Sequence, residues 1–238
     1  MPEAVLAANG VSKLFGGKRA LSDASIVLHR NEVHGIIGPN GSGKSTFINV
    51  ISGALKPDGG TVVLDQRNVS RLSARRRSRC GIGRTYQTPQ IFESLTLRQH
   101  IALNAAPAVD NWGLEAAAFL RLEPQLDRPV GAFSHALRRM AELCHVAAAR
   151  PRVVLLDEPA AGLSAPEMGM LARLVLWLRE RTAVCLVEHN MKFLLDLADR
   201  VTVLEHGNII ASGTPDEIIA NANVRRAYLG SDFTRPAT

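Results

Sequence analysis

The sequence predicts an α/β protein with a mainly parallel sheet, an antiparallel β lobe and an inserted helical lobe. Residues 153–156 and 183–187 are continuous apolar runs, which are typical of strands buried on both faces of a parallel sheet. Between them, apolar residues recur at helical spacing from Leu171 to Leu178, so residues 166–180 are expected to form a surface helix. Strands that alternate with helices in this way favour a parallel sheet covered by helices.

A glycine-rich loop at residues 38–45 supports this prediction. Its sequence, GPNGSGKS, fits the pattern G-x-x-x-x-G-K-[ST], and it lies between an expected strand (33–37) and an expected helix (46–51). An ordinary glycine-rich turn would not need that context. Backbone N–H groups of such a loop close around phosphate oxygens, and the helix N-terminus adds partial positive charge. We therefore expect these residues to bind a nucleotide: Gly38, Pro39, Asn40, Gly41, Ser42, Gly43, Lys44, Ser45 and Thr46.

Two side chains of this loop have specific expected roles. Lys44 is expected to reach the β- and γ-phosphates, and the hydroxyl of Ser45 is expected to ligate Mg²⁺.

Length and composition indicate a globular protein. The chain has 238 residues, of which 46% are hydrophobic and 21% charged, enough for a substantial core. Its apolar runs are shorter than the roughly 18 residues of a membrane span, and no signal peptide is recognised at its start. The three cysteines, Cys80, Cys144 and Cys185, have neither disulfide nor zinc spacing, so we expect a reducing compartment.

The N-terminal part of the chain is expected to form short strands. Residues 4–37 mix apolar runs with turns at 15–17 and 29–32, which indicates an antiparallel strand pair leading into the strand before the phosphate loop. A turn at 57–60 precedes an expected strand at 61–64.

Arginines account for most of the formal charge of +6 and concentrate in an expected helix at 71–79. The cluster is either a solvated helix face or a surface for a phosphate-rich or protein partner. Its members are Arg71, Arg75, Arg76, Arg77 and Arg79. A strand at 81–86 is expected to follow.

Residues 88–133 change character, because prolines separate short helical patterns with little strand signal. A helix is expected at 134–149, with Ser134 as its N-cap. We interpret 1–238 as one domain, in which 1–87 and 150–238 form the nucleotide-binding core and 88–149 the helical lobe.

The C-terminal part contains one more expected strand, at 201–204, and one clear helix start. Residues 214–217, Thr-Pro-Asp-Glu, form a capping box with proline at the first helical position.

Two acidic residues follow the expected strand at 153–156. Asp157 and Glu158 would lie at the carboxyl edge of the sheet, where ligands of α/β proteins bind. Asp157 suits a Mg²⁺ contact, and Glu158 suits a general base that polarises the attacking water. Alone, the pair could simply end a strand, but downstream of a phosphate loop we favour the functional interpretation.

Gln87 and His189 also follow expected strands, on the same edge as the phosphate loop. Gln87 could connect Mg²⁺ or water to the helical lobe, and His189 could hold the γ-phosphate and the attacking water; the alternative for each is an ordinary surface residue. Phe15 is a candidate for stacking on a base, and its alternative is a core position.

Together these motifs resemble the ATPase subunit of an ATP-binding cassette (ABC) transporter over essentially the whole chain. The order is phosphate loop, glutamine, helical lobe, Leu-Leu-Asp-Glu-Pro and then Glu-His. The resemblance implies a P-loop NTPase of the ABC type that hydrolyses ATP with Mg²⁺. It also implies that Phe15 stacks on adenine, that Gln87 is the lid glutamine at the metal, that Asp157 ends the Walker B strand and that Glu158 is the catalytic glutamate.

The same resemblance implies a head-to-tail dimer in which ATP lies between the Walker A loop of one cassette and the signature helix of the other. Residues 162–165 resemble the D-loop, and His189 resembles the switch histidine. The signature falls at 133–137, so Ser134 and His135 are expected to contact the partner's nucleotide. Permease subunits are expected to dock on the helical lobe, with a solute-binding protein acting through them.

The signature departs from the family pattern. Residues 133–137 are FSHAL where the family has LSGGQ or close to it, so only Ser134 is retained outright. Ala136 replaces the glycine that allows close backbone approach, and Leu137 replaces a polar side chain. We therefore expect a heterodimer with a cassette of intact signature, in which one site turns over and the other mainly binds ATP.

Shorter matches resemble the branched-chain amino-acid importer branch, a pattern that urea and amide importers share. They lie at residues 84–87, 91–92, 95–97, 157–163 and 224–230. The expected place is the cytoplasmic face of the inner membrane, as a peripheral subunit with no nucleic-acid partner. The alternatives are a cassette ATPase not tied to transport, such as those that remodel DNA, ribosomes or iron–sulfur assemblies, and a weakly hydrolysing regulatory cassette.

Overall fold

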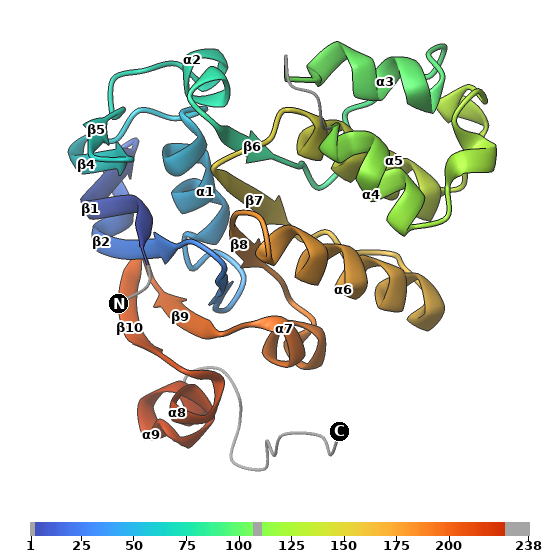
Figure 1. The fold of residues 1–238 in the computed structure, drawn as a ribbon. Coiled ribbons are helices and arrows are strands. Elements are labelled where there is room, and N and C mark those ends of the chain that lie inside the picture. The colour runs from blue at the N-terminus through green and yellow to red at the C-terminus, as the bar shows by residue number, and fades with distance from the viewer. Residues whose placement is uncertain (1–2, 107–110, 227–238) are drawn as a thin grey trace.

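The computed structural model describes residues 3–106 and 111–226. Figure 1 shows an antiparallel sheet beside a larger mixed sheet. The helices labelled α3, α4 and α5 lie on the opposite side of the molecule from the antiparallel sheet.

The antiparallel sheet contains the expected N-terminal strand pair. Its order is β2-β1-β4-β5, with β1 Ala4–Phe15, β2 Lys18–His29, β4 Gly59–Leu64 and β5 Arg67–Asn68. The turn expected at 57–60 is wrong in part, because Gly59 and Gly60 already belong to β4. The amide of Asp58 donates to the carbonyl of Ser12, and Gly59 pairs with Ser12, so the chain joins the sheet earlier than the Pro-Asp-Gly-Gly sequence indicates.

The mainly parallel sheet is confirmed, with one antiparallel edge. Its order is β10-β9-β3-β8-β7-β6, with β3 Val33–Ile37, β6 Ile82–Arg84, β7 Val153–Asp157, β8 Ala183–Val187, β9 Arg200–Glu205 and β10 Asn208–Gly213. All neighbours are parallel except β9 and β10. The strand β3, which leads into the phosphate loop, lies in the middle between β8 and β9.

The central strands are buried on both faces, as their apolar runs predict. In β7, Val153 and Leu155 pack in one hydrophobic cluster, and Val154 and Leu156 pack in another. Helix α1 (Lys44–Ser52) fills the first cluster between the two sheets. Helices α6 (Ala165–Arg179) and α7 (Met191–Leu197) cover the other face.

The helical lobe is confirmed in its helical character. It contains α3 (Leu97–Asn104), α4 (Trp112–Phe119), two 3₁₀ turns (Glu123–Gln125 and Val130–Ala132) and α5 (His135–Ala148). Ser134 is the N-cap of α5, because its hydroxyl accepts from the amide of Leu137 at 3.3 Å. The capping box at Thr214 begins α8 (Pro215–Ala220), followed by the short α9 (Ala222–Val224).

Two expected elements are shorter than the sequence indicates. The strand expected at 81–86 is β6, which ends at Arg84. It ends there because the backbone of Tyr86 and Gln87 leaves the sheet and bonds to side chains of α5. The helix expected at 71–79 is α2 (Ala74–Arg79), and Ser73 takes the N-cap position. Within residues 3–106 and 111–226, no helix combines the length and the hydrophobicity needed to cross a bilayer.

Arg77 is an exception to the interpretation of the arginine cluster as a solvated face. Its side chain is fully buried, whereas Arg75, Arg76 and Arg79 are exposed. The guanidinium donates to the carbonyls of Val50 and Ile51, both at 2.7 Å, and it also donates to the carbonyls of Ser70 and Leu72. Carbonyls at a helix C-terminus lack partners within the helix, so Arg77 caps the end of α1.

We expect Arg77→Met to lower the free energy of unfolding by about 3 kcal/mol, because several buried carbonyls lose a charged donor. Urea denaturation of the purified chain measures this. Arg76→Met is the matched control on the same helix and should change the free energy of unfolding by no more than about 0.5 kcal/mol. Equal, small losses in both variants would show that the cap does not stabilise the fold.

Candidate functional site

The phosphate loop opens into a cavity of about 290 Å³ at the carboxyl edge of the parallel sheet. This cavity collects candidate residues from four segments that are distant in the sequence. It is lined by Ala20, Asn40, Gly41, Ser42, Gly43, Lys44, Ser45, Thr46, Gln87, Glu158 and His189. The expectation that these residues share one edge of the sheet is therefore met for the phosphate loop, Gln87, Glu158 and His189.

Two glycines allow the loop to take its shape. Gly38 has φ +149° and Gly43 has φ +108°, both in the region that favours glycine. A Cβ at Gly38 would lie 2.1 Å from the carbonyl oxygen of Leu204, and a Cβ at Gly43 would lie 2.6 Å from that of Ala20. No side chain fits at either position, so the loop packs directly against backbone on both sides.

Lys44 supplies the positive charge of the cavity. Its Nζ donates to the carbonyls of Gly38 at 2.8 Å and Pro39 at 3.0 Å, and the side chain is almost fully buried. Burial lowers the pKa of Lys44, and the charges of Glu158 and Asp157 oppose this shift. Among the described residues, the ammonium has no carboxylate at hydrogen-bond distance, so it is available to an anion.

The start of α1 also suits a phosphate. Its N-cap is Gly43, and no side chain caps the helix. The hydroxyl of Ser42 is buried without a hydrogen-bond partner in the part of the chain that the structure describes. Uncapped amides, an unpartnered hydroxyl and a buried ammonium fit phosphate oxygens, which accept several hydrogen bonds.

Asp157 is the last residue of β7 and precedes Glu158, which lines the cavity. Its Oδ2 accepts from the guanidinium of Arg84 at 3.2 Å, and its Oδ1 is buried without a partner among the described residues. Burial raises the pKa of Asp157, and the adjacent guanidinium of Arg84 opposes that shift. A carboxylate oxygen left free in this way fits a Mg²⁺ ligand, since Mg²⁺ binds through oxygen and one or two carboxylates.

Glu158 and His189 form a pair in the lining of the cavity. His189 Nε2 lies 2.6 Å from Glu158 Oε1. The backbone of Glu158 has φ +49°, a left-handed conformation that is uncommon for a residue with a side chain and is concentrated at functional sites. Glu158 is 18% exposed and His189 43% exposed, so water can reach both. A carboxylate with these properties can accept a proton from a water molecule.

Glu188 is a residue of the site that the sequence analysis did not single out. It is buried, and its Oε1 accepts from the amide of Ala160 at 2.7 Å, while its Oε2 accepts from the amide of His189 at 3.1 Å. Glu188 therefore connects the turn after β7 to the turn after β8. Its signal in the sequence is an acidic residue directly after a buried strand, the same signal as Asp157.

Gln87 lies where the cavity meets the helical lobe, and a buried ion pair of α5 holds its backbone. The guanidinium of Arg139 donates to the carbonyls of Tyr86 and Gln87 and to Glu142 at 2.8 Å. Glu142 Oε1 accepts from the amides of Tyr86 at 3.3 Å and Gln90 at 3.2 Å. Burial raises the pKa of Glu142, and the Arg139 charge opposes this. This pair was not predicted, because its spacing of three residues is ordinary for a helix surface.

Six predicted residues are not part of the cavity lining: the pair Gly38–Pro39 and Asp157, which adjoin lining residues in the sequence, and Phe15, Ser134 and His135. Phe15 ends β1 and is 47% exposed, with Lys13 Nζ 5.6 Å from the centroid of its ring. Ser134 and His135 lie at the start of α5, on the outside of the helical lobe. A Cβ added at Gly162 would lie 3.6 Å from His135 Cε1, so the signature end of α5 adjoins the D-loop segment of its own chain. The roles of Phe15, Ser134 and His135, like those of the other site residues, stay predictions.

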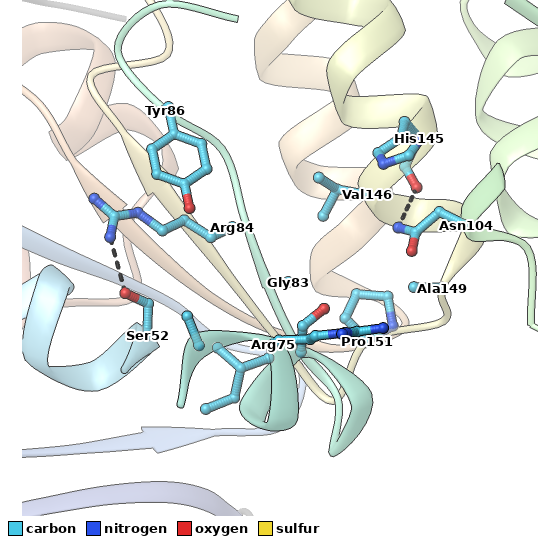
Figure 2. A pocket seen from close by; sticks show the side chains of 13 residues that line it. Ser52, Arg75, Gly83, Arg84, Tyr86, Asn104, His145, Val146, Ala149 and Pro151 are labelled. Carbon is cyan, nitrogen blue, oxygen red and sulfur yellow. Dashed lines mark hydrogen bonds between the residues drawn. The ribbon is translucent and has the colours of Figure 1, made fainter. Parts of the chain in front are cut away.

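A second cavity, of about 280 Å³, lies between α2, β6 and the helical lobe (Figure 2). Arg75, Arg84 and Tyr86 line it on the core side, and Asn104 and His145 line it on the lobe side. The amide of Asn104 donates to the carbonyl of His145 at 2.9 Å, which fixes α3 to α5 at this wall.

Comparison with known proteins agrees with this geometry. The family described as "ABC transporter" matches residues 21–161, and the one described as "Branched-chain amino acid ATP-binding cassette transporter" matches residues 208–234. The high-affinity branched-chain amino acid transport ATP-binding protein LivG of Salmonella typhimurium is 36% identical over 97% of this chain and 99% of its own length. The lipopolysaccharide export system ATP-binding protein LptB of Escherichia coli is 31% identical, again over 97% of this chain and 99% of its own length.

Solved structures give the same result. The crystal structure of the ADP conformation of an ATP-binding cassette of an ABC transporter has a TM-score of 0.84 and 28% identity, and it covers 96% of this chain and 99% of that one. With the phosphate loop, the Asp157–Glu158 strand end and His189 at one edge of the sheet, and with a family match over more than half of the chain, this protein belongs to the ATPase subunits of the ABC transporter family.

Proposed function

We propose that this chain is the Mg²⁺-dependent, ATP-hydrolysing subunit of an ABC importer for branched-chain or other hydrophobic amino acids. The observation that carries the proposal is the single cavity that joins the ammonium of Lys44 to the Glu158–His189 pair. It brings a phosphate-binding cation and a water-activating carboxylate to one place.

Each residue of the site has a proposed role in ATP hydrolysis. Lys44 and the loop amides bind the phosphates, while Ser45, Asp157 and Gln87 would hold Mg²⁺, which neutralises phosphate charge when it is bound. Glu158 accepts the proton of the attacking water, and His189, 2.6 Å from it, orients the carboxylate and the γ-phosphate. Phe15, at the end of the β1–β2 hairpin, is proposed to stack on adenine.

The substrate proposal rests on the relatives. LivG is named for branched-chain amino acid transport, and a family of branched-chain amino acid cassettes matches residues 208–234. LptB, which is named for lipopolysaccharide export, is nearly as similar. The amino-acid assignment therefore draws mainly on the C-terminal match and the importer-like motifs around Gln87 and Asp157. Importers of urea and amides share those motifs and are the second candidate.

We place the permease subunits at the second cavity, which adjoins residues 88–149, the proposed helical lobe. Tyr86 belongs to its lining, and Phe92 and Leu103 of the lobe are exposed apolar side chains. Exposed apolar side chains are typical of protein–protein contacts. This position would hold the chain peripherally at the cytoplasmic face of the membrane, while residues 1–87 and 150–238 bind the nucleotide.

A second cassette is proposed to complete the site. Ser134 and His135 lie away from the chain's own cavity, so a nucleotide of the partner is the ligand that they could contact. Ala136 and Leu137 make this signature weak, and a heterodimer with a cassette of intact signature would compensate. A cassette that hydrolyses little and mainly regulates is the alternative that these two positions favour.

We expect Glu158→Gln to stop hydrolysis and retain ATP binding, because the amide keeps the shape of the side chain and removes the base. Lys44→Ala should instead abolish binding, because the phosphate charge loses its buried counterion. A titration with labelled ATP and a steady-state ATPase assay of both variants separate the two roles. Undiminished turnover of Glu158→Gln would remove Glu158 from catalysis, and tight ATP binding by Lys44→Ala would refute the phosphate site.

The transport role predicts specific partners. Under gentle extraction from its native membranes, the chain should co-purify with membrane-spanning permease subunits and a second cassette. Exposed Leu103→Asp should release the permease without changing ATP binding, because a charge enters the proposed contact. Recovery of the native chain wholly in the soluble fraction, without a membrane partner, would favour the alternative of a cassette ATPase not tied to transport.

The signature predicts low activity for the chain on its own. A homodimer contains two weakened signatures, so the isolated chain should hydrolyse ATP slowly, and Ala136→Gly with Leu137→Gln should raise the rate. The glycine removes the methyl group that crowds the partner's phosphate, and the glutamine restores a hydrogen-bonding side chain. Brisk hydrolysis by the unmodified chain, with no change in the double variant, would show that the departure is harmless.

A further inference from the structure

Arg84 contacts the two elements that carry Ser45 and Asp157, two of the three proposed Mg²⁺ ligands. Its NH1 donates to Asn49 Oδ1 at 2.6 Å and to Ser52 Oγ at 2.8 Å, and both of these residues belong to α1, which also carries Ser45. Its NH2 donates to Asp157 Oδ2 at 3.2 Å. One guanidinium thus bridges the helix of the phosphate loop and the strand end of the carboxylate.

The surroundings keep this guanidinium in place. Arg84 is the last residue of β6 and pairs with Leu155 of β7, two residues before Asp157. The side chains of Arg84 and Asp157 are only 9% and 5% exposed. The centroid of the Tyr86 ring lies 4.7 Å from the guanidinium carbon of Arg84, and Figure 2 shows the arginine between that ring and Ser52.

The bridge acts on one oxygen of the carboxylate and leaves the other free. Because Asp157 Oδ2 is bonded to Arg84, the carboxylate has a defined orientation, and Oδ1 is the oxygen without a partner among the described residues. A charge-assisted hydrogen bond to a metal-binding carboxylate is the kind of outer contact that orients a ligand.

We propose that Arg84 is a positioning residue for the Mg²⁺ site: it orients the Asp157 carboxylate and fixes its distance from Ser45 through α1. This inference rests on the proposed function, because it assumes that Asp157 and Ser45 hold the metal. Arg84 itself does not contact metal or nucleotide. Its effect is to present ligand atoms in a fixed arrangement before the metal binds, and loss of such an outer partner typically weakens metal affinity 10- to 100-fold.

The test measures metal affinity directly, with Mn²⁺ as the probe. All proteins carry Glu158→Gln, so that ATP is not consumed, and the protein is in excess, so that all ATP is bound. The electron paramagnetic resonance signal of free Mn²⁺ then gives the dissociation constant of Mn²⁺ from the protein–ATP complex. Arg84→Met keeps the approximate length of the side chain and removes the bridge, so we expect Mn²⁺ to bind about 10-fold more weakly.

A second measurement separates positioning from general damage. ATP affinity in the presence of a chelator should stay within twofold of the parent, because Arg84 does not contact the phosphate loop. Arg84→Lys should recover part of the Mn²⁺ affinity, since it keeps the charge but cannot reach all three acceptors. Arg76→Met, which removes an exposed arginine of α2, is the matched control and should change neither quantity.

Each outcome decides the inference. Unchanged Mn²⁺ affinity in Arg84→Met, or an equal loss of chelator-measured ATP affinity, overturns it. If Arg84→Met does not fold, Asn49→Ala with Ser52→Ala frees the guanidinium from α1, and unchanged Mn²⁺ affinity there overturns it as well. If the parent complex binds Mn²⁺ no more tightly than ATP does in solution, the proposed metal site itself is wrong, and the inference is overturned with it.

Discussion

The direct packing of the phosphate loop against backbone is the constraint on which the rest of the structure depends. Gly38 touches the carbonyl of Leu204 in β9, and Gly43 touches that of Ala20 in β2, with no space for a side chain at either contact. The position of the loop is therefore fixed by contacts with both sheets. Because α1 begins at Lys44 and packs in the core between the sheets, the same contacts hold the N-terminus of this helix at the proposed phosphate site.

A set of buried charges extends this constraint to the rest of the site. Arg77 caps the C-terminus of α1, Arg84 joins α1 to Asp157, and Glu188 joins the turns after β7 and β8. Each buried charge has several hydrogen bonds, which is what allows a charge to stay in a low-dielectric interior. Breaking one partner would leave the other uncompensated, so these contacts favour a single arrangement of the side chains at this edge of the sheet.

The Arg139–Glu142 pair has a related effect between the core and the helical lobe. Arg139 donates to the backbone carbonyls of Tyr86 and Gln87, and Glu142 accepts from the backbone amides of Tyr86 and Gln90. A displacement of α5 would therefore displace the segment that carries Gln87 into the cavity lining. This segment is also a wall of the second cavity. If a permease docked there as proposed, it would contact the backbone that leads to Gln87, and docking and hydrolysis would share this structural element.

The sequence by itself determined the central strands, the phosphate loop and the candidate site residues at the strand ends, because these depend on local patterns. Apolar runs predicted β3, β7 and β8, the G-x-x-x-x-G-K-S pattern predicted the loop before α1, and strand ends predicted Asp157, Glu158 and His189. Only the tertiary structure decided which polar side chains are buried and what they contact. Arg77, Arg84, Arg139 and Glu188 look like ordinary surface charges in the sequence, because each has at least one partner that lies between 26 and 73 residues away. Such pairings follow from how the helices pack on the sheet, and no periodicity along the chain records them.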